Sequence, residues 1–591
     1  MPNNYIFADK SLQMPEIKNR IFYIFLISII IFNTDLFSQE VPQPVANKGI
    51  YDFLDELANI HIITINSAIK PYSRLYISQR LKEAGEKRDQ LNSRQQKELN
   101  FYMLDFGKEM SEEWRNGLKA QGRNGKMDHG NTDENEEGRN GQKAEGLKGK
   151  KTETIFTRDS ERAGRRDLFY YRDSLFSFTL NPILGGEIFG NSSGTATYAR
   201  NGLEARGYIG KWGFYASLRD NHENPFLGLP QYLTQRVDGH VKEANAWSEM
   251  MGGVTYAWKW GSAGLVKDNL QWGNNYNGAN IFGGNNPTFV QLRIHISPVK
   301  WFDFNYFHGW LNSEVVDSSK SYWTTNSYGT VYRAVYHKKF IAANMFTITP
   351  AKNLHVSAGN SIVYSYDNAN PAYLIPVLFY KSVDHSLSDG IDNMNSQMFF
   401  DISSRQIKNL HIYATWFIDE LNVSRFTKKN AWNFFSYKAG FRLTDLPVSN
   451  LSFTTELTYT YPLTFQHYVP TLTFQNAGYN LGYYLKDNSR EIYIAFDYHP
   501  ARTLDLNLFF LDEIRGPDYT ELGTNRVGNP PIANIQWHNT SYGFKGSYQV
   551  INDLYTWVSF SVGNITGDTR WSPAYFYGKK NTLNAGMTFG F

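Results

Sequence analysis

The chain contains no cysteine among its 591 residues. This absence excludes disulfides, a catalytic thiol and a lipid-modified amino-terminal cysteine, so a secreted form would need another kind of anchor. An excess of one charge is also missing, because 59 Lys and Arg stand against 56 Asp and Glu. A formal charge of +3 does not suggest a nucleic-acid partner.

Long apolar runs are scarce, and the one at residues 21–32 lies near the amino terminus. Lys18 and Arg20 precede it, and Ser38 follows it. A basic flank, a short apolar core and a small residue predict a secretory signal peptide over residues 1–38. A retained anchor is the alternative, but a spanning helix needs roughly 20 apolar residues. No later segment has that length, so a membrane location requires a β-barrel.

Strand-like alternation of apolar and polar residues is what the sequence does contain. Strand side chains point to opposite faces with period two, so each such run has one apolar face. A soluble sandwich would alternate too, but here the pattern recurs to the last residues and follows a secretion signal, which favours a membrane barrel. The aromatic content of 16% fits interfacial girdles. One run places Leu451, Phe453, Leu457, Tyr459 and Tyr461 opposite Ser452, Thr454, Glu456, Thr458 and Thr460.

Connections between these runs are alternately short and long. They separate about 18 strands, an even number, as bacterial barrels require. With both ends in the periplasm, short turns are periplasmic and long loops extracellular, provided that residues 328–349 form one strand despite His337, Lys338 and Lys339. The prediction is an all-β transmembrane barrel of about 18 antiparallel strands over residues 167–591. Long loops are expected at 185–195, 221–247, 270–286, 313–327, 366–395, 421–432, 462–489, 513–538 and 565–580.

The residues before the barrel divide into a helical part and a low-complexity part. Between residues 49 and 112, apolar residues recur at helical spacing, and Pro71 and Ser73 mark a break and a new helix start. This predicts a small periplasmic α-helical bundle. Residues 113–166 are dominated by Gly, Lys, Asn and Glu, which cannot bury enough apolar area to offset their ordering entropy. We expect a disordered charged linker there; a basic binding tail is the alternative.

Several segments resemble the Wzi-type capsule-assembly family, outer-membrane barrels with an amino-terminal helical bundle. They cover most of the chain thinly, and none is a catalytic signature. The insert at 116–166 departs from the family pattern. The matching segments are 58–84; Lys-Asp-Asn-Leu-Gln-Trp-Gly at 267–273 with Asn286, Pro287 and Gln-Leu-Arg at 291–293; Glu-Leu-Thr-Tyr-Thr-Tyr-Pro at 456–462 with Phe-Gln-His at 465–467; and Leu481, Gly482, Glu491 and Tyr-His-Pro at 498–500.

The resemblance implies a lectin-like, non-enzymatic protein that anchors exported capsular polysaccharide or exopolysaccharide at the cell surface. Implied partners are this polysaccharide, outer-membrane lipid and the outer-membrane assembly machinery; no cofactor is expected. Binding needs outward loops with aromatic rings for sugar faces and amide or basic groups for hydroxyls and carboxylates. The candidate glycan-binding residues, each aromatic of which could instead be a girdle residue, are Trp272, Asn274, Asn275, Tyr276, His467, Tyr468, Arg515, Tyr519 and Trp537.

Two other functions remain open from the sequence. A transport channel would have an open, conducting lumen. A barrel enzyme acting on lipid or glycan would gather Ser and His at the outer rim, where His467, or His538 beside Ser541, is available. Inward-facing acids would look the same in any barrel lumen, so they do not distinguish these functions. Those acids are Glu456, Asp497 and Asp505.

Metal binding has weak sequence support. No His-Glu-x-x-His motif or paired metal-ligand spacing occurs in the chain. Asp384, His385, Asp389, Asp392 and Asn393 lie close together and could bind a divalent cation such as calcium. A solvated loop explains these residues equally well, so no metal site is predicted.

Overall fold

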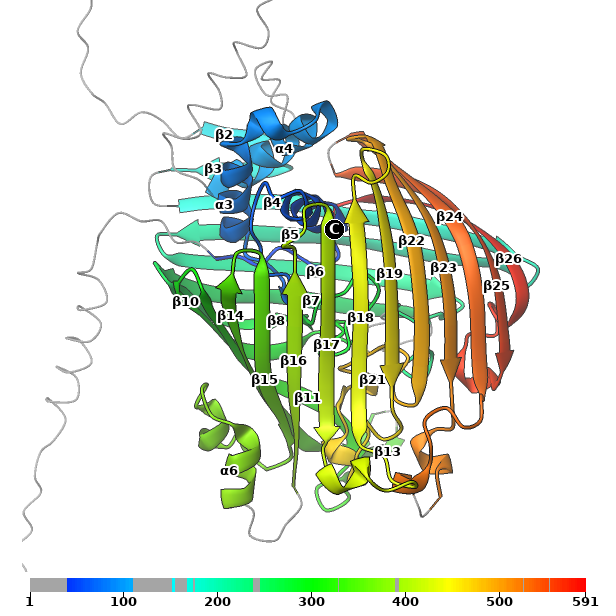
Figure 1. Ribbon diagram of the computed structural model, residues 1–591. Coiled ribbons are helices and arrows are strands. Elements are labelled where there is room, and N and C mark those ends of the chain that lie inside the picture. Colours follow the sequence, from blue (N-terminus) through cyan, green and yellow to red (C-terminus); the bar gives the residue numbers. More distant parts are fainter. Residues whose placement is uncertain are drawn as a thin grey trace, which may run out of the picture.

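The computed structural model describes residues 40–109, 151–154, 167–173, 176–236, 245–327, 329–387, 393–523, 526–551 and 553–590. The predicted signal peptide, residues 1–38, lies outside these. The main element is a closed barrel of 18 antiparallel strands, which confirms the predicted fold class (Figure 1). Strands adjacent in sequence pair, and β26 pairs with β4 to close the barrel.

The barrel strands differ in length, and the longest are β4, β5 and β14, with 16 residues each. They are β4 (Phe176–Asn191), β5 (Gly194–Ile209), β6 (Trp212–Asn224), β7 (Ala246–Trp258), β8 (Gly261–Asp268), β10 (Phe289–Val299), β11 (Phe302–Val316), β14 (Tyr336–Ala351), β15 (Leu354–Tyr364), β16 (Met394–Ser404), β17 (Leu410–Glu420), β18 (Phe434–Thr444), β19 (Leu451–Thr460), β22 (Ser489–Ala501), β23 (Leu504–Arg515), β24 (Trp537–Ile551), β25 (Leu554–Gly567) and β26 (Gly578–Phe589).

Alternation along the strands separates an apolar outer face from a polar inner face. In β19 the predicted polar face, from Ser452 to Thr460, is buried inside the barrel, whereas Leu457 points outward and is 42% exposed. Large apolar side chains are exposed in the same way around the barrel, for example Phe496, Leu508 and Leu583. An apolar outer surface with polar groups inside is the arrangement of an outer-membrane barrel.

The predicted turns and loops mostly hold, but the long loop expected at 185–195 is wrong. β4 and β5 continue through this region and are joined by Ser192 and Ser193 alone. Glycine is depleted in strands, yet Gly185 and Gly186 lie within β4. In the structure Gly185 pairs with Arg200 on one side and Thr588 on the other, and its missing side chain leaves room for that of Arg200.

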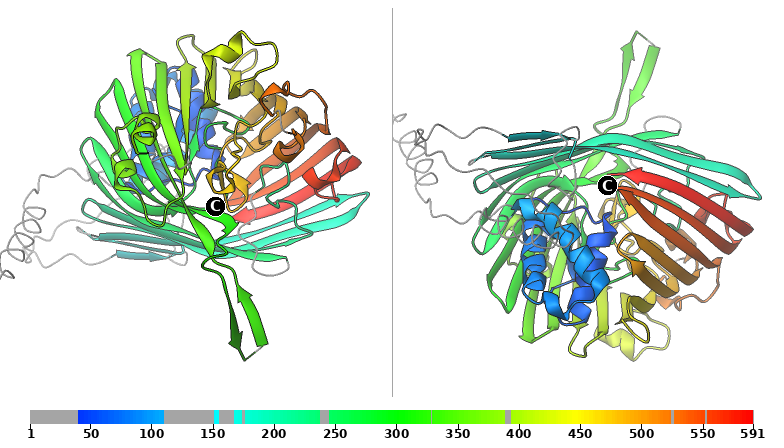
Figure 2. Two further views of the ribbon diagram at one scale, coloured as in Figure 1. Left: turned by 90° about the horizontal axis from the view of Figure 1, so that it is seen from below. Right: turned by 90° about the horizontal axis from the view of Figure 1, so that it is seen from above.

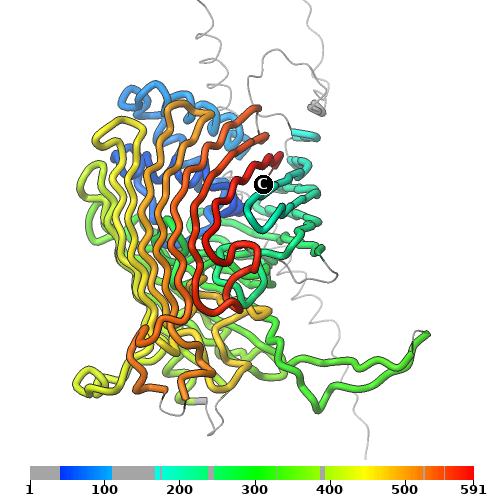
Figure 3. Tube along the Cα trace, turned by 90° about the vertical axis from the view of Figure 1, so that its right-hand side faces the viewer, coloured from blue at the N-terminus to red at the C-terminus, as the bar shows by residue number. Residues whose placement is uncertain are grey.

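The predicted strand at 328–349 is confirmed in part. His337, Lys338 and Lys339 do lie within one strand, β14, so the assignment of turns and loops to opposite ends holds. Residues before β14 instead form a hairpin of β12 (Tyr322–Asn326) and β13 (Gly329–Arg333). This hairpin projects from the end of the barrel that carries the long loops (Figures 2 and 3).

Among the described residues, three α-helices precede the barrel, in the region where a helical bundle was expected: α2 (Lys48–Asn59), α3 (Arg74–Gly85) and α4 (Ser93–Phe106). The Ser73 hydroxyl accepts a hydrogen bond from the Tyr76 N–H (3.1 Å) and caps α3. Asn92 and Gln95 form a capping box at the start of α4. The apolar faces share one core, which includes Ile50, Phe53, Leu54, Leu57, Ile77, Leu81, Leu99 and Phe106.

The helices lie against the end of the barrel that carries the short turns, within its outline (Figures 1 and 2). The carbonyl of Asn59 accepts a hydrogen bond from the N–H of Asn409 (2.7 Å), in the turn after β16. The Asn92 amide donates to Asn450 (3.0 Å), in the turn after β18. The helices are therefore fixed to the barrel rim, and the chain that follows α2 enters the lumen.

One edge of β4 is shared between two partners. Leu184 to Gly190 pair with β26, and Ser177 to Leu180 pair with β3 (Phe169–Arg172) outside the closed barrel. β3 also pairs with β2 (Lys151–Thr154), so where the linker was expected the chain has a strand at these four residues. The rest of the predicted linker, 113–150 and 155–166, lies outside the described residues.

The long connection after β15 packs against the outer face of the barrel. The Tyr306 hydroxyl donates to the carbonyl of Tyr373 (2.8 Å), and the Asn344 amide donates to the carbonyls of Pro376 and Leu378 (2.8 and 2.9 Å). The connection contains a short helix, α6 (Tyr380–Leu387). Among the described residues, no helix is long and apolar enough to cross a membrane.

Other short elements lie in the connections. They are β20 (Gln475–Asn476), β21 (Tyr479–Asn480) and 3₁₀ turns at Arg88–Gln90, Gly107–Glu109, Pro371–Leu374, Val423–Phe426, Pro470–Leu472, Tyr519–Glu521, Arg526–Gly528 and Thr569–Trp571.

Glu98 on α4 should make the stability of the helices depend on pH. Burial raises the pKa of Glu98 to about 8, although Arg94 acts in the opposite direction. A carboxyl with a higher pKa in the folded than in the unfolded state favours folding at low pH, and this contribution is lost as the pH rises through 8. We expect Glu98→Gln to leave thermal stability unchanged at pH 5 and to raise it at pH 9. The measurement is the temperature at which heat-modifiable gel migration is lost, with Glu86→Gln as a control at an exposed position. If Glu98→Gln shifted this temperature equally at both pH values, the predicted pH dependence would be wrong.

Candidate functional site

The connection between β8 and β10, residues 269–288, turns inward and fills part of the lumen. Within it, β9 (Gln271–Trp272) pairs with β1 (Ile69–Lys70), which belongs to the segment that follows α2. Two parts of the chain that are far apart in sequence thus form a small sheet inside the barrel. The prediction that this loop points outward is wrong, because its apolar residues pack with inner-wall residues in one core. We call residues 269–288 the lumenal loop, and we call this loop together with α2 and residues 60–73 the plug.

Trp272 lies in this core and is 3% exposed. Its ring meets those of Phe282, Phe307 and Phe399 edge to face, with ring centres 5.3, 5.3 and 5.9 Å away. A ring enclosed in this way has no free face for a surface sugar. We therefore assign Trp272 to the packing of the plug.

Asn274 and Asn275 hold the loop in place. Asn274 is 1% exposed; its backbone N–H and its side-chain amide donate to the Asp401 carboxylate (2.9 and 2.7 Å), and its side-chain oxygen accepts from the Ser67 hydroxyl (2.5 Å). The half-buried Asn275 amide donates to the carbonyl of Gly273 (2.8 Å). The hydrogen-bonding groups predicted to meet a glycan are used within the protein.

Tyr276 belongs to a buried polar cluster that joins α2, the lumenal loop and the barrel wall. Its hydroxyl lies 2.5 Å from an Asp55 carboxylate oxygen and 2.8 Å from Nδ1 of His411. Arg405 pairs with Asp55 at 2.5 Å. Burial raises the pKa of Asp55, but Arg405 and the other neighbouring cations outweigh it and hold that pKa below its usual value. We call Asp55, Tyr276, Arg405 and His411 the lumenal clamp.

Glu456 anchors the same loop from β19. Its carboxylate, 2% exposed, accepts the backbone N–H groups of Tyr276 and Asn277 (2.7 and 2.8 Å) and pairs with Lys438 (3.1 Å). The Tyr413 hydroxyl donates to it as well. A carboxylate with these partners holds the loop. The other candidate acids are also paired: Asp497 with Arg442 at 3.3 Å and Asp505 with His499 at 2.5 Å.

His467 and Tyr468 lie at the long-loop end, and the structure leaves them accessible. Their rings stack with centres 4.5 Å apart, and Tyr468 is 62% exposed. Of the predicted glycan-binding residues, this pair is best placed to present a ring to a ligand outside the barrel.

Arg515, Tyr519 and Trp537 lie near one another at this end, but two of them are buried. Arg515 stacks on Trp571 at 3.9 Å and pairs with Asp487 (3.1 Å) and Asp518 (3.0 Å). Trp537 is 1% exposed and donates to the Ser572 hydroxyl (2.7 Å). Both side chains therefore support the loops. Tyr519 is half-buried beneath Arg526, whose guanidinium lies 4.2 Å from the ring centre.

Sequence reasoning missed the most exposed rings at the long-loop end. Trp323 is 69% exposed and pairs with Tyr332 across the β12–β13 hairpin, with ring centres 5.3 Å apart. The signal was present as aromatic residues beside Thr and Asn, but this stretch was divided between a loop and a strand. We define the loop-end aromatic set as Tyr322, Trp323, Tyr332, Phe426 and Tyr468, which are between 45% and 69% exposed.

The sequence-based enzyme candidates do not come together. His538 bonds to Asp512 (2.8 Å), whereas Ser541 is an odd number of residues away on β24 and points to the other face. Ser403 does lie 2.9 Å from Nε2 of His411, but these two side chains are 1% and 2% exposed. A substrate has no access to a serine so enclosed.

The structure also gives no support to the acidic-loop metal site. Asp389 and Asp392 lie outside the described residues, and Asp384 and His385 belong to α6. Within the part of the chain that the structure describes, no group of three or more His, Asp or Glu side chains is arranged to hold a metal ion.

Comparison with known proteins gives a likeness of fold. No family model and no curated protein sequence matches the chain. Wzi of Escherichia coli, described as an outer-membrane protein involved in group 1 capsule assembly and a carbohydrate-binding β-barrel, superposes with a TM-score of 0.54 and 11% identity, over 94% of this chain and 99% of that one. OprD of Pseudomonas aeruginosa (TM-score 0.37, 10% identity, 70% and 94% covered) and OccAB3 of Acinetobacter baumannii (0.40, 11%, 70% and 99%) are more distant. The chain has a Wzi-like fold.

Proposed function

We propose that this protein is a non-enzymatic outer-membrane barrel that binds exported polysaccharide and holds it at the cell surface. The short turns and the helices lie in the periplasm, and the long loops face outward, which is the usual orientation of such barrels. The loop-end aromatic set then faces the polysaccharide.

The observation that carries the proposal is the set of exposed aromatic rings at the long-loop end of a barrel whose lumen is partly filled by its own connections. Exposed apolar groups that gather mark interaction sites. Within the loop-end aromatic set, Tyr322, Trp323 and Tyr332 gather on the β12–β13 hairpin, whereas Phe426 and Tyr468 belong to other connections. Sugar rings present flat C–H faces that stack on such rings. Asn, Thr, Lys and Arg side chains beside the rings can bind hydroxyl and carboxylate groups.

The connections that pack inside the lumen favour this function over a transport channel. Residues 269–288 and 461–488 contribute Trp272, Phe282, Phe465, Phe474 and Tyr483 to a core that also includes inner-wall residues. Apolar side chains packed into the lumen narrow the water-filled path that a porin requires. The fold is similar, over nearly the whole of both chains, to that of a barrel described as carbohydrate-binding. This likeness also favours polysaccharide binding over transport.

The test is retention of polysaccharide by cells. Deletion of the protein should release polysaccharide into the medium without stopping its synthesis, because the proposed role follows export. The measurement is the partition of polymer between cell pellet and medium in matched strains. An unchanged partition in the deletion strain, with the barrel confirmed absent, would reject the proposed function; polymer trapped inside the cell would indicate a channel.

Within the protein, Trp323→Ala combined with Tyr468→Ala should weaken retention. Stacking on one ring contributes about 1–3 kcal/mol for a flat ligand face, so two rings should change affinity by tenfold or more. Leu508→Ala is the matched control, because Leu508 is 53% exposed on the lipid-facing wall. Equal polysaccharide retention in the double variant and the control would show that the loop-end aromatic set is not part of the binding surface.

A further inference from the structure

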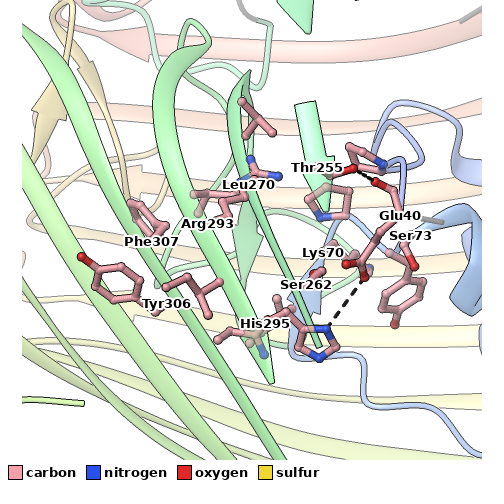
Figure 4. A pocket seen from close by; sticks show the side chains of 18 of the residues that line it. Glu40, Lys70, Ser73, Thr255, Ser262, Leu270, Arg293, His295, Tyr306 and Phe307 are labelled. Atoms are coloured by element: carbon pink, nitrogen blue, oxygen red, sulfur yellow. Dashed lines mark hydrogen bonds and ion pairs between the residues drawn. The ribbon is translucent and has the colours of Figure 1, made fainter. Parts of the chain in front are cut away.

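A cavity of about 180 Å³ lies inside the barrel, between the segment that follows α2 and the wall formed by β7, β8, β10 and β11 (Figure 4). Leu270 and Trp272 of the lumenal loop line it toward the long-loop end. Glu40, His295 and Asp303 line it toward the short-turn end and are 23%, 36% and 26% exposed. The cavity is therefore open on the short-turn side, opposite to the loop-end aromatic set.

The size of the cavity fits one six-membered ring. For comparison, an engineered apolar cavity of about 150 Å³ accommodates benzene. The lining is mostly apolar, but polar groups gather on one side, so a ligand that meets both needs apolar faces as well as hydrogen-bonding groups. A ligand that fills it must be ring-sized and must carry several hydrogen-bonding groups.

Carboxylate, amide and hydroxyl groups gather on one side of the cavity. The Asp303 carboxylate lies 2.7 Å from Nε2 of His295 and accepts from the Asn305 amide (2.5 Å). A carboxylate has about four lone-pair sites, so Asp303 can still accept from ligand hydroxyls. Glu40 lies 3.8 Å from Nδ1 of His295 and supplies a second acceptor. The two carboxylates lie beside opposite nitrogens of His295, so they can accept from hydroxyl groups at separate positions of one ring.

Ring surfaces line the cavity from both the helical part and the wall. Tyr76, on α3, is half-buried and lies beside Tyr72, with ring centres 5.2 Å apart. Phe307 of β11 lies on the wall side (Figure 4). Apolar rings beside convergent acceptors form a typical small-molecule site, in which the polar groups fix orientation.

The charges at the cavity favour an uncharged ligand. Arg293 donates to the Asn269 carbonyl (2.8 Å) and lies 3.6 Å from Asp268, so its charge is balanced. The Lys70 ammonium lies 5.6 Å from the centre of the Tyr51 ring, on α2. Glu40 and Asp303 pair with His295 at the open side (3.8 and 2.7 Å), so this histidine offers no unpaired charge to an anion.

We propose that this cavity binds a single uncharged sugar unit that enters from the short-turn side of the barrel. The choice of a sugar as ligand class rests on the proposed function, whereas ring size, hydroxyl recognition and lack of charge follow from the cavity. The site would let the protein contact polysaccharide on the periplasmic side, separately from the outer surface.

The test uses the purified full-length barrel in detergent and the methyl glycosides of glucose, galactose, mannose and N-acetylglucosamine as probes, with glucuronate as the anionic comparison. Binding is followed by saturation-transfer NMR titration. At least one neutral glycoside should bind saturably, and glucuronate at least fivefold more weakly than the best of them. Absence of saturable binding by all four neutral probes would overturn the proposal, as would tighter binding of glucuronate.

Variants distinguish this cavity from the outer surface. Asp303→Asn and Tyr76→Ala should each weaken glycoside binding at least fivefold, and Tyr468→Ala should not change it. Heat-modifiable migration checks that each barrel is folded, and if one of the cavity variants does not fold, the other decides. Binding that is lost in Tyr468→Ala and kept in the cavity variants would reject the cavity while leaving polysaccharide retention, measured in cells, intact.

Discussion

Replacing Arg405 with alanine should turn a closed barrel into a conducting one. Arg405 pairs with Asp55 (2.5 Å), and it donates to the side-chain oxygen of Asn59 (2.7 Å) and to the Ser67 hydroxyl (3.0 Å). All three partners belong to α2 and the segment after it. Removal of one partner of a buried ion pair typically costs about 3–5 kcal/mol, because the other charge is left without compensation. The expected result is release of the plug, since Arg405 lies at the wall and Asp55 on the plug.

Planar lipid bilayers give the measurement. The wild-type barrel should show little ion current, and Arg405→Ala should show discrete conductance steps. Arg425→Ala is the control, because Arg425 pairs with the half-exposed Glu420 at the long-loop end. If a correctly folded Arg405→Ala barrel showed no conductance steps, the remaining contacts would be sufficient to hold the plug without the lumenal clamp.

The pH dependence of the clamp follows from the same contact. The pKa of Asp55 is lower in the folded protein than its ordinary value, since its cationic neighbours outweigh burial. A carboxyl of this kind contributes stability above its unfolded pKa, and the contribution is lost as the pH falls through the folded value. We therefore expect the wild-type barrel to stay closed between pH 5 and pH 8, and conductance that appears in this window would contradict this assignment.

The barrel could be predicted from the sequence because its wall is a local pattern. Leu457 faces out and Glu456 faces in as period two requires, and the turns carry the Gly, Pro, Asn and Asp of tight connections. Residues 185–195, expected to form a loop, lie mostly in strands because residues such as Gly185 are paired on both edges. Pairing partners cannot be known before the sheet is assembled.

The direction of the long loops could not be predicted in the same way. An aromatic and amide-rich loop such as residues 269–288 has the composition of a sugar-binding surface and also that of a plug. The choice depends on partners far away in sequence: Asn274 bonds to Asp401, and Tyr276 bonds to Asp55. Composition indicates which contacts a loop can make, but only the fold determines whether those contacts come from a ligand or from the barrel wall.

Glu456 is the residue whose interpretation changes most between the sequence and the structure. From sequence it was a candidate acid, whereas in the structure it receives two backbone N–H groups of the lumenal loop and the charge of Lys438. Glu456→Ala should free residues 269–288 and leave Lys438, which is fully buried, with Glu491 at 4.0 Å as its nearest carboxylate partner. The expected cost is again about 3–5 kcal/mol, most of it from the unpaired cation.

A double variant separates the two parts of this effect. In Glu456→Ala with Lys438→Met, the unpaired charge is removed, so thermal stability should recover most of the loss while the loop stays released. The readouts are the temperature at which heat-modifiable migration is lost and the rate of protease cleavage within residues 269–288. Glu420→Ala, which removes a half-exposed carboxylate, should change neither. If Glu456→Ala left both the cleavage rate and the transition temperature at wild-type values, the lumenal loop would be held by its other contacts, and Trp272→Ala, which removes the centre of its aromatic core, would then be the next substitution to test.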